Sequence, residues 1–355
     1  METAAFDYDL PPARIAQHPV EPRDASRLLV DHGPGRPPEH RHVRDLPQLL
    51  ERGDLLVLNE TRVLPARLHL RKATGGAVEV LLLERLDDEA PGDSEGWQAL
   101  VRPSRKVAPG TALTGAADDE GADPVVEVHD DAGEGKRLIR LLLPDGADRD
   151  DELALIERLG EMPLPPYITT PLAEPERYQT VYARRPASAA APTAGLHFTT
   201  TLLEAVRASG VAIATVELVV GLDTFRPMAT EQVEDHMMHT EAYRVPEETW
   251  SQVKATHEQG GSVVAVGTTA MRALESAAAR GELAGRTDLF IKGEFPFAVV
   301  DQLLTNFHLP RSSLLVLVDA FIGPRWRDLY AEALAGSYRF LSFGDAMLIS
   351  RKRWP

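Results

Sequence analysis

A block of short strand-like segments, residues 67–149, interrupts this 355-residue chain and restricts the folds open to it. The segments AVEVLLLE, WQALV, PVVEVH and RLIRLLL are separated by turns rich in Gly, Asp and Pro, and no long helical period lies between them. Several short strands joined by frequent turns are typical of a small all-β unit. We therefore predict a β-barrel domain over residues 67–149.

Beyond residue 150 the pattern alternates between helices and strands, which indicates an α/β domain. The length also exceeds that of one average domain. We expect the α/β class: a main, barrel-like α/β domain made of residues 1–66 and 150–355, interrupted by the inserted β-barrel. The predicted helices are 151–160, 246–261 and 268–281, and the predicted strands include 211–221, 262–267, 313–318 and 345–350.

The absence of cysteine excludes disulfides, thiolate metal sites and a thiol nucleophile. No apolar run reaches 18 residues, so we expect no membrane partner. The first residues lack the charged and apolar regions of a signal peptide. These features favour a cytoplasmic enzyme.

A net charge of −16 argues against a general nucleic-acid-binding protein, which usually has a basic face. Local basic segments remain open to phosphate contact, since a few Lys and Arg side chains suffice. The two candidates are VRPSRK, with Arg102, Arg105 and Lys106, and the stretch Arg351–Arg353. The alternative for both is a solvated surface cluster.

The segment APTAGLHF, residues 191–198, places Thr193, Gly195 and His197 in a stiff loop before a predicted helix. Polar groups at a helix N-terminus suit a polar ligand. The alternative is a buried turn with one satisfied core histidine.

Two further segments carry polar residues after apolar runs. In VVAVGTTAMRALES, Thr268 or Thr269 caps a helix on which Arg272 and Glu275 share a face, so the segment predicts a site for a carboxylate, a ribose or an adenine edge. Its alternative is a capped helix with a surface ion pair. In VVDQLLTNFHLP, Asn306 and His308 point the same way if the segment is extended, and suit base recognition or proton transfer. The alternative there is a loop whose polar groups satisfy buried backbone.

Other site types have little support. His236, His239 and Glu241 invite a metal site, but HxxH is a loose pattern and we expect no metal. No GxSxG, GxGxxG or GxxxxGK[ST] segment is present, which removes the main sequence support for a serine hydrolase, a Rossmann dinucleotide site or a P-loop.

Taken together, the motifs resemble the S-adenosylmethionine:tRNA ribosyltransferase-isomerases of queuosine synthesis over nearly the whole chain. The resemblance rests on FDYDLPPARIAQHPVEPRDASRLLV, LVLNETRVLPARL, GEMPLPPYI, RYQTVYA, APTAGLHFT, DHMMHTEAYRVP, VGTTAMRALES, VDQLLTNFHLP and YRFLSFGDAMLI. It implies an α/β domain with an inserted β-barrel. It also implies transfer and rearrangement of the ribosyl group of S-adenosylmethionine onto 7-aminomethyl-7-deazaguanine in a tRNA anticodon, with epoxyqueuosine-tRNA, adenine and methionine as products.

The resemblance implies S-adenosylmethionine as a cosubstrate, no bound cofactor and no metal. The sulfonium acidifies the neighbouring 5′ carbon, so a base can form an ylide there before adenine departs. We expect His197 and His308 to transfer protons, with Asp301 as the carboxylate alternative, in an enzyme that acts as a monomer. The expected donor-binding residues are Thr193, Gly195, Thr268, Thr269, Arg272 and Glu275; those expected around the base are Asn59, Arg62, Asp301, Asn306, Arg339 and Asp345.

Two segments depart from the family pattern. Val219 and Asp223 in VVGLDTF stand where the family usually has a histidine and then VGxGTF, and Gly293–Phe295 replaces a usual PGY. Loss of an imidazole and gain of carboxylates make the site less basic. The alternatives are therefore a divergent relative that uses the same donor on a non-tRNA acceptor, and a non-catalytic tRNA-binding relative.

Overall fold

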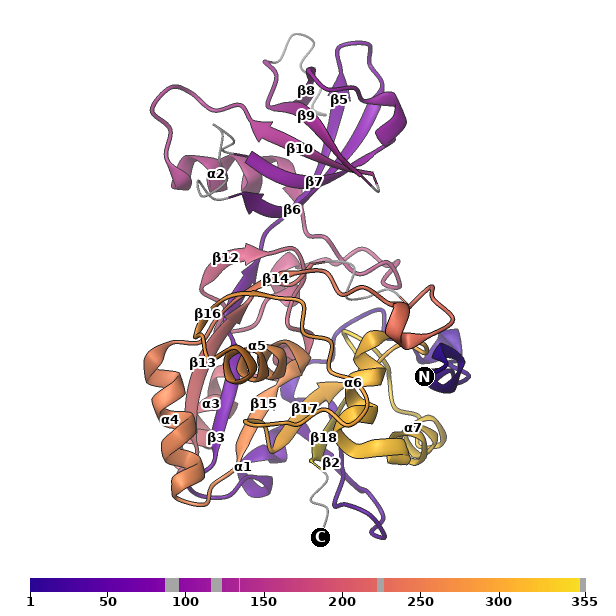
Figure 1. Cartoon of the computed structure of the whole chain (residues 1–355), viewed down its shortest axis with the longest axis vertical. Helices are drawn as coiled ribbons and strands as arrows, with labels where there is room; N and C mark the ends of the chain where they lie inside the picture. Colours follow the sequence, from indigo (N-terminus) through magenta and orange to yellow (C-terminus); the bar gives the residue numbers. More distant parts are fainter. Residues whose placement is uncertain (87–95, 116–122, 134, 222–226, 352–355) are drawn as a thin grey trace. The chain divides into compact units, whose positions relative to one another are not determined.

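The computed structural model describes residues 1–86, 96–115, 123–133, 135–221 and 227–351 (Figure 1). Their contacts divide the chain into two compact units. We call Met1–Arg62, Pro165–Arg185 and Ala191–Pro355 the main unit, and Val63–Leu164 with Pro186–Ala190 the barrel unit.

The main unit is built on a nine-stranded mixed sheet with the order β16-β14-β13-β3-β15-β17-β18-β1-β2. Strands β13, β3, β15 and β17 are parallel to one another, and β18 is antiparallel to β17. The bounds are β1 (Arg27–Val30), β2 (Glu39–His42), β3 (Leu55–Asn59), β13 (Ala212–Leu218), β14 (Glu241–Arg244), β15 (Val263–Val266), β16 (Ala284–Thr287), β17 (Gln302–Asn306) and β18 (Ala346–Ser350). The expected α/β class of the main domain is confirmed. Its described strands form an open sheet and not the barrel-like arrangement that was expected, because the outer strands β16 and β2 do not pair with each other.

Helices cover both faces of this sheet because its central strands are apolar on both sides. The core on one face joins Leu56 and Leu58 of β3 to α1 (Leu46–Leu49) and α3 (Thr200–Ala208). Helix α5 (Gly267–Arg280) contacts β13, β3, β15 and β17. The remaining helices of the unit are α4 (Glu247–Glu258), α6 (Ser313–Ile322) and α7 (Trp326–Ala335).

The predicted strand at 313–318 is wrong, since this run lies in α6. A short apolar run rich in branched residues fits a buried helix as well as a buried strand. Ser312 decides the outcome locally, because its Oγ accepts a hydrogen bond from the Leu315 N–H at 3.3 Å and caps the helix.

The barrel unit contains a closed ring of six strands in the order β5-β6-β7-β10-β9-β8, with β8 pairing back to β5. The bounds are β5 (Arg67–Lys72), β6 (Ala77–Leu86), β7 (Gly96–Arg102), β8 (Thr111–Gly115), β9 (Val126–Gly133) and β10 (Lys136–Leu141); β11 (Gly160–Glu161) adds to β5. The predicted inserted β-barrel is thus confirmed. Closure removes the free edges that an open sheet of this size would leave.

Helix α2 (Arg149–Leu159), which the sequence assigned to the main domain, falls in the barrel unit. Its Glu152 accepts a hydrogen bond from the buried Trp97 Nε1 at 2.6 Å and one from Arg85 Nε at 3.1 Å. These two bonds join the helix to β7 and β6. The units consequently divide at 62/63 and 164/165, whereas the predicted domain boundaries were 66/67 and 149/150.

Candidate active site

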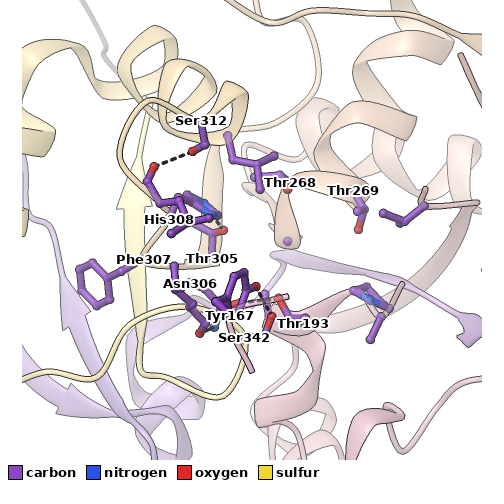
Figure 2. A pocket seen from close by; sticks show the side chains of 18 residues that line it. Tyr167, Thr193, Thr268, Thr269, Thr305, Asn306, Phe307, His308, Ser312 and Ser342 are labelled. Atoms are coloured by element: carbon purple, nitrogen blue, oxygen red, sulfur yellow. Dashed lines mark hydrogen bonds between the residues drawn. The ribbon is translucent and has the colours of Figure 1, made fainter. Parts of the chain in front are cut away.

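A pocket of about 580 Å³, including the space at its mouth, lies where β15 and β17 end. Ligands of open α/β sheets bind outside the carboxyl ends of the parallel strands. The walls combine apolar residues with hydroxyl, amide and imidazole side chains, and Figure 2 labels the polar ones. The lining residues are Tyr167, Ala191–Ala194, Val220, Gly267–Thr269, Thr305–Leu309, Ser312, Leu314, Leu341 and Ser342.

The first polar wall is the N-terminus of α5. Gly267 turns the chain from β15 into the helix with a φ of +87°, which favours glycine. No side chain caps this terminus, so N–H groups of the first turn remain available to a ligand. Thr269 is 8% exposed, and its Oγ1 has no hydrogen-bond partner in the described part of the chain. Thr268 and Thr269 therefore line a wall with free donors and the positive end of a helix dipole.

A second wall joins two predicted motifs. Thr193 lies in the 3₁₀ helix η7 (Thr193–His197), and its Oγ1 donates to Asn306 Oδ1 at 2.9 Å. Asn306 Nδ2 donates to the Leu341 carbonyl at 3.1 Å. The Asn306 amide thus ties β17 to the loops on either side, and Figure 2 shows this group gathered beside Tyr167 and Ser342.

His308 is buried and lines the pocket beside Thr305, whose Oγ1 lies 3.1 Å from His308 Nε2. No residue in the described ranges hydrogen-bonds to His308 Nδ1. The backbone is fixed from behind: the His308 N–H donates to Tyr330 Oη at 2.9 Å, and Tyr8 Oη donates to the His308 carbonyl. Burial lowers the pKa of the imidazole to about 3, so the ring is neutral at pH 7.

His197 is buried elsewhere and does not line this pocket. Its Nδ1 lies 3.0 Å from the Ala194 carbonyl, and its Nε2 lies 2.9 Å from the Gly344 carbonyl. Burial lowers the pKa of His197, although both carbonyls oppose that shift. With a backbone acceptor at each nitrogen, the ring holds η7 against the loop before β18.

Gly195 serves packing. A Cβ at this position would lie 2.0 Å from Tyr182 Oη and 2.9 Å from the Thr180 methyl carbon. The residue allows η7 to lie against the segment that carries these two side chains, and it does not line the pocket.

Arg272 and Glu275 are buried on α5 and turn away from the pocket. Arg272 Nη1 forms an ion pair with Glu241, and its Nε donates to the Leu289 carbonyl at 3.3 Å. Glu275 accepts from the N–H groups of residues 298–300 at 2.9–3.1 Å. Both side chains anchor α5 to neighbouring segments. The ion pair of Arg272 is buried and not on the surface, and neither residue lines the pocket.

Asn59 and Arg62 also lie outside the pocket. Asn59 is buried; its Nδ2 donates to the Leu218 carbonyl at 3.0 Å, and its Oδ1 accepts from the Thr61 N–H at 3.2 Å. Arg62 forms an ion pair with Glu176 at 2.6 Å on the surface. These bonds to the backbone give Asn59 a role in the turn that follows β3.

Arg339 and Asp345 shape the loop before β18. Asp345 accepts from the N–H groups of Arg27 at 2.9 Å and Arg339 at 2.8 Å. The Arg339 guanidinium donates to the carbonyls of His18 at 2.9 Å and Phe343 at 2.8 Å. All these partners are backbone groups, which gives the pair a structural role.

Asp301 precedes β17, whereas the pocket lies where that strand ends. At ~3.3 Å per residue, Asp301 and Asn306 are about 16 Å apart along the strand. The Asp301 carboxylate accepts from the Val263 N–H at 3.0 Å, lies 2.9 Å from His257 Nε2 and pairs with Arg351 at 3.3 Å. The structure thus separates Asp301 from the two proposed histidines.

The sequence matches the queuosine biosynthesis protein family over residues 3–349. The chain belongs to this family. The S-adenosylmethionine:tRNA ribosyltransferase-isomerase of Thermotoga maritima is 50% identical over 353 residues, 98% of this chain and 100% of that protein. The enzyme of the same name from Symbiobacterium thermophilum is 51% identical over 360 residues, with the same coverage of each chain. A crystal structure of S-adenosylmethionine tRNA ribosyltransferase from Thermotoga maritima aligns with a TM-score of 0.54 and 40% identity, covering 97% of this chain and 99% of that chain.

This member of the queuosine biosynthesis family is therefore an enzyme, a ribosyltransferase-isomerase with S-adenosylmethionine and tRNA as substrates. Identity near 50% over the full length favours the tRNA acceptor over the non-tRNA alternative. Of the two departures from the family pattern, residues 293–295 do not line the pocket, and Asp223 of the other lies outside the described residues. Val219 is described and precedes Val220, which lines the pocket.

Glu241, one of the three residues whose spacing suggested a metal site, forms an ion pair with Arg272. In the described ranges, no group of three or more His, Cys, Asp or Glu side chains is arranged to hold a metal. Among the described residues, no helix is long and apolar enough to cross a membrane.

Several pocket residues were missed from the sequence. Tyr167 Oη and Ser342 Oγ are 2.7 Å apart on the wall beside Asn306, and Ser312 lies near His308 (Figure 2). Tyr167 stands in GEMPLPPYI and Ser342 in YRFLSFGDAMLI, two segments that carry the family resemblance. Only that resemblance could have indicated them, because Tyr167 and Ser342 have no histidine or acidic residue beside them in the sequence.

Proposed function

We propose that this pocket binds S-adenosylmethionine and is where its ribosyl group is transferred to 7-aminomethyl-7-deazaguanine in the anticodon region of tRNA. The enzyme acts as a monomer in the cytoplasm. The observation that carries the proposal is the juxtaposition, in one pocket, of a neutral imidazole at His308 and an uncapped helix N-terminus at Gly267–Thr269.

The α5 terminus suits the methionine carboxylate of the donor. Free N–H groups and the helix dipole favour an anion there, by roughly 0.3–1 kcal/mol at an exposed site and more when water is excluded. The unpartnered Thr269 Oγ1 supplies a further hydrogen bond. The apolar walls at Val220, Phe307 and Leu314 accommodate the rest of the donor.

His308 is the residue we assign to proton transfer. Its ring borders the pocket with Nε2 beside Thr305 Oγ1, so with Nε2–H donating to that hydroxyl the lone pair of Nδ1 can accept the proton from the 5′ carbon beside the sulfonium. The C–H bond breaks, its electron pair remains on carbon as the ylide, and the proton moves to the imidazole. When the bond to adenine breaks, its electron pair leaves with the base, which then needs a proton. An imidazolium of low pKa is a strong acid, so His308 can pass on that proton.

Thr305 positions this ring. Its Oγ1 lies at Nε2, and Nδ1 is the nitrogen that has no hydrogen-bond partner among the residues that the structure describes. His197 and Asp301, the other two predicted catalytic residues, have their polar atoms occupied by backbone groups or by other side chains. We assign both a positioning role.

Isotope loss tests the proposal. S-Adenosylmethionine with two deuterons at the 5′ carbon is incubated with the enzyme and with tRNA that carries the deazaguanine precursor, and the product nucleoside is analysed by mass spectrometry. We expect adenine release and a product that has lost one deuteron. A tRNA with unmodified guanine is the control and should give no product. Retention of both deuterons would overturn the ylide route, and absence of adenine release would overturn the assigned reaction.

A further inference from the structure

One end of the barrel carries a cluster of basic side chains on a chain whose net charge is −16. We call it the basic end. Its members are Arg71, Lys72, Arg102, Arg105, Lys106 and Lys136. Arg71, Arg102, Arg105 and Lys106 are exposed, and Lys72 and Lys136 are half-buried.

The barrel topology brings these residues together from three places in the chain. Strands β5 and β7 end, and β10 begins, at the same end of the barrel, because β6 and β7 as well as β7 and β10 are antiparallel. Hydrogen bonds confirm the proximity. Lys72 Nζ donates to the Lys106 carbonyl at 3.1 Å, and Arg137 Nη2 donates to the Ser104 carbonyl at 3.1 Å. The segment VRPSRK therefore lies beside the ends of the other two strands.

Few carboxylates offset this charge. Glu79 lies 4.0 Å from Arg102 and 3.9 Å from Arg67, so it is shared between two arginines. Asp131 pairs with Arg137, which is buried and outside the cluster. The other five members of the basic end have no ion pair with a carboxylate in the described part of the chain; Glu134 lies outside it. Among the described residues, these five side chains therefore have no carboxylate partner, although Lys72 and Arg71 donate to backbone carbonyls.

Basic side chains near the other end of β6 form internal ion pairs. Arg85 and Arg149 both pair with Glu152, which also holds the buried Trp97. Those charges stabilise the attachment of α2. At the basic end the described residues show bonds from Lys72 Nζ to the Lys106 carbonyl and from Arg71 Nη1 to the Gly75 carbonyl, and neither bond attaches a helix to the barrel.

We propose that the basic end is a contact surface for the phosphate backbone of tRNA. The inference rests on the proposed function, since it takes tRNA as the acceptor. Exposed Lys and Arg side chains bind RNA by releasing the counterions of phosphates, and this term does not depend on sequence. It suits an enzyme that must hold a large polyanion while its pocket recognises one base. It also explains how a chain of this net charge can bind RNA, because six cations are gathered on one surface.

The test removes two charges from the basic end with R105Q/K106Q and compares the variant with R140Q/R158Q. The control removes the same charge from exposed positions of the same unit that form no ion pair in the described residues. Binding of full-length tRNA with the deazaguanine precursor is measured between about 50 and 200 mM salt. For R105Q/K106Q we expect the slope of log K against log salt to fall by about 2, and affinity near 50 mM to fall about tenfold or more. KM for tRNA should rise while kcat is unchanged.

R140Q/R158Q should keep the wild-type slope, affinity and KM. If R105Q/K106Q also keeps them, the basic end is not a tRNA contact, and its partner would have to be an anion of another class. If both variants weaken binding equally, the effect is one of net charge and the inference is overturned. Failure of the proposed function is distinct, because then the wild-type enzyme itself releases no adenine with this tRNA.

Discussion

His197 and His308 are both buried and both have a lowered pKa, yet their rings have different neighbours. Each nitrogen of His197 lies at a backbone carbonyl, whereas one nitrogen of His308 lies at a hydroxyl and the ring borders the pocket. Because a backbone carbonyl stands against each nitrogen of His197, neither nitrogen is open to a substrate atom. The difference teaches that the surroundings, more than the residue type, decide which histidine can react.

The largest expected effect is on turnover of His308→Ala. General-base assistance contributes about 10²–10⁴-fold in rate, so kcat should fall by that factor. Donor binding should change little, since the carboxylate subsite at α5 is intact. Single-turnover adenine release and equilibrium binding of S-adenosylmethionine measure the two quantities. If the variant keeps near-normal turnover, His308 only lines the pocket, and the contrast drawn between the two histidines is wrong.

His197→Ala should lower stability rather than catalysis. The substitution leaves the buried carbonyls of Ala194 and Gly344 without their imidazole neighbour, and an unsatisfied buried polar group costs about 1–3 kcal/mol. We expect a lower midpoint in urea unfolding, with kcat of the folded enzyme within about tenfold of wild type. His308→Ala is the matched control, because its ring faces the pocket. A loss of kcat like that of His308→Ala at unchanged stability would reverse the two assignments.

The smallest expected effect concerns pH. The folded-state pKa of His308 is about 3, below the value of about 6.5 in an unfolded chain, so the unfolded state binds more protons between these values. The resulting stability is present above about pH 6.5 and is lost as pH falls toward 3. Between pH 7 and 5 the loss is about 2 kcal/mol. Urea unfolding of wild type and His308→Gln at both pH values measures it, and the variant should lose less. Equal losses would show that the ring is not buried as a neutral group.

Patterns that extend over many residues predicted the barrel and the alternation of strands and helices in the main unit. Strand β15, the turn at Gly267 and helix α5 follow from a buried run, a glycine and a helical period within one segment. The pocket's position at the carboxyl ends of the strands follows from the same alternation. The run at 313–318 failed because its apolar residues fit either a helix or a strand.

The roles of individual polar residues were less accessible. The contact between His197 and the Gly344 carbonyl could not be predicted from the sequence, because every residue has a backbone carbonyl and none is marked as the partner. Asp301 and His308 are close in sequence, but a strand carries them to opposite ends of β17. Thr193 and Asn306 were both predicted as site residues, and both line the pocket. Their hydrogen bond joins segments far apart in the chain, so the sequence could not indicate it.

The pocket's assembly from distant segments has a consequence for folding. Its walls come from residues 191–194, 267–269, 305–309 and 341–342 together with Tyr167, Val220, Ser312 and Leu314, so no contiguous fragment of the main unit contains it. Contacts of this non-local kind form late and slowly along a folding route. A partly folded chain therefore has no complete place for S-adenosylmethionine and cannot start the chemistry prematurely. If the donor binds there as proposed, it links these segments and draws the equilibrium toward the native state by mass action.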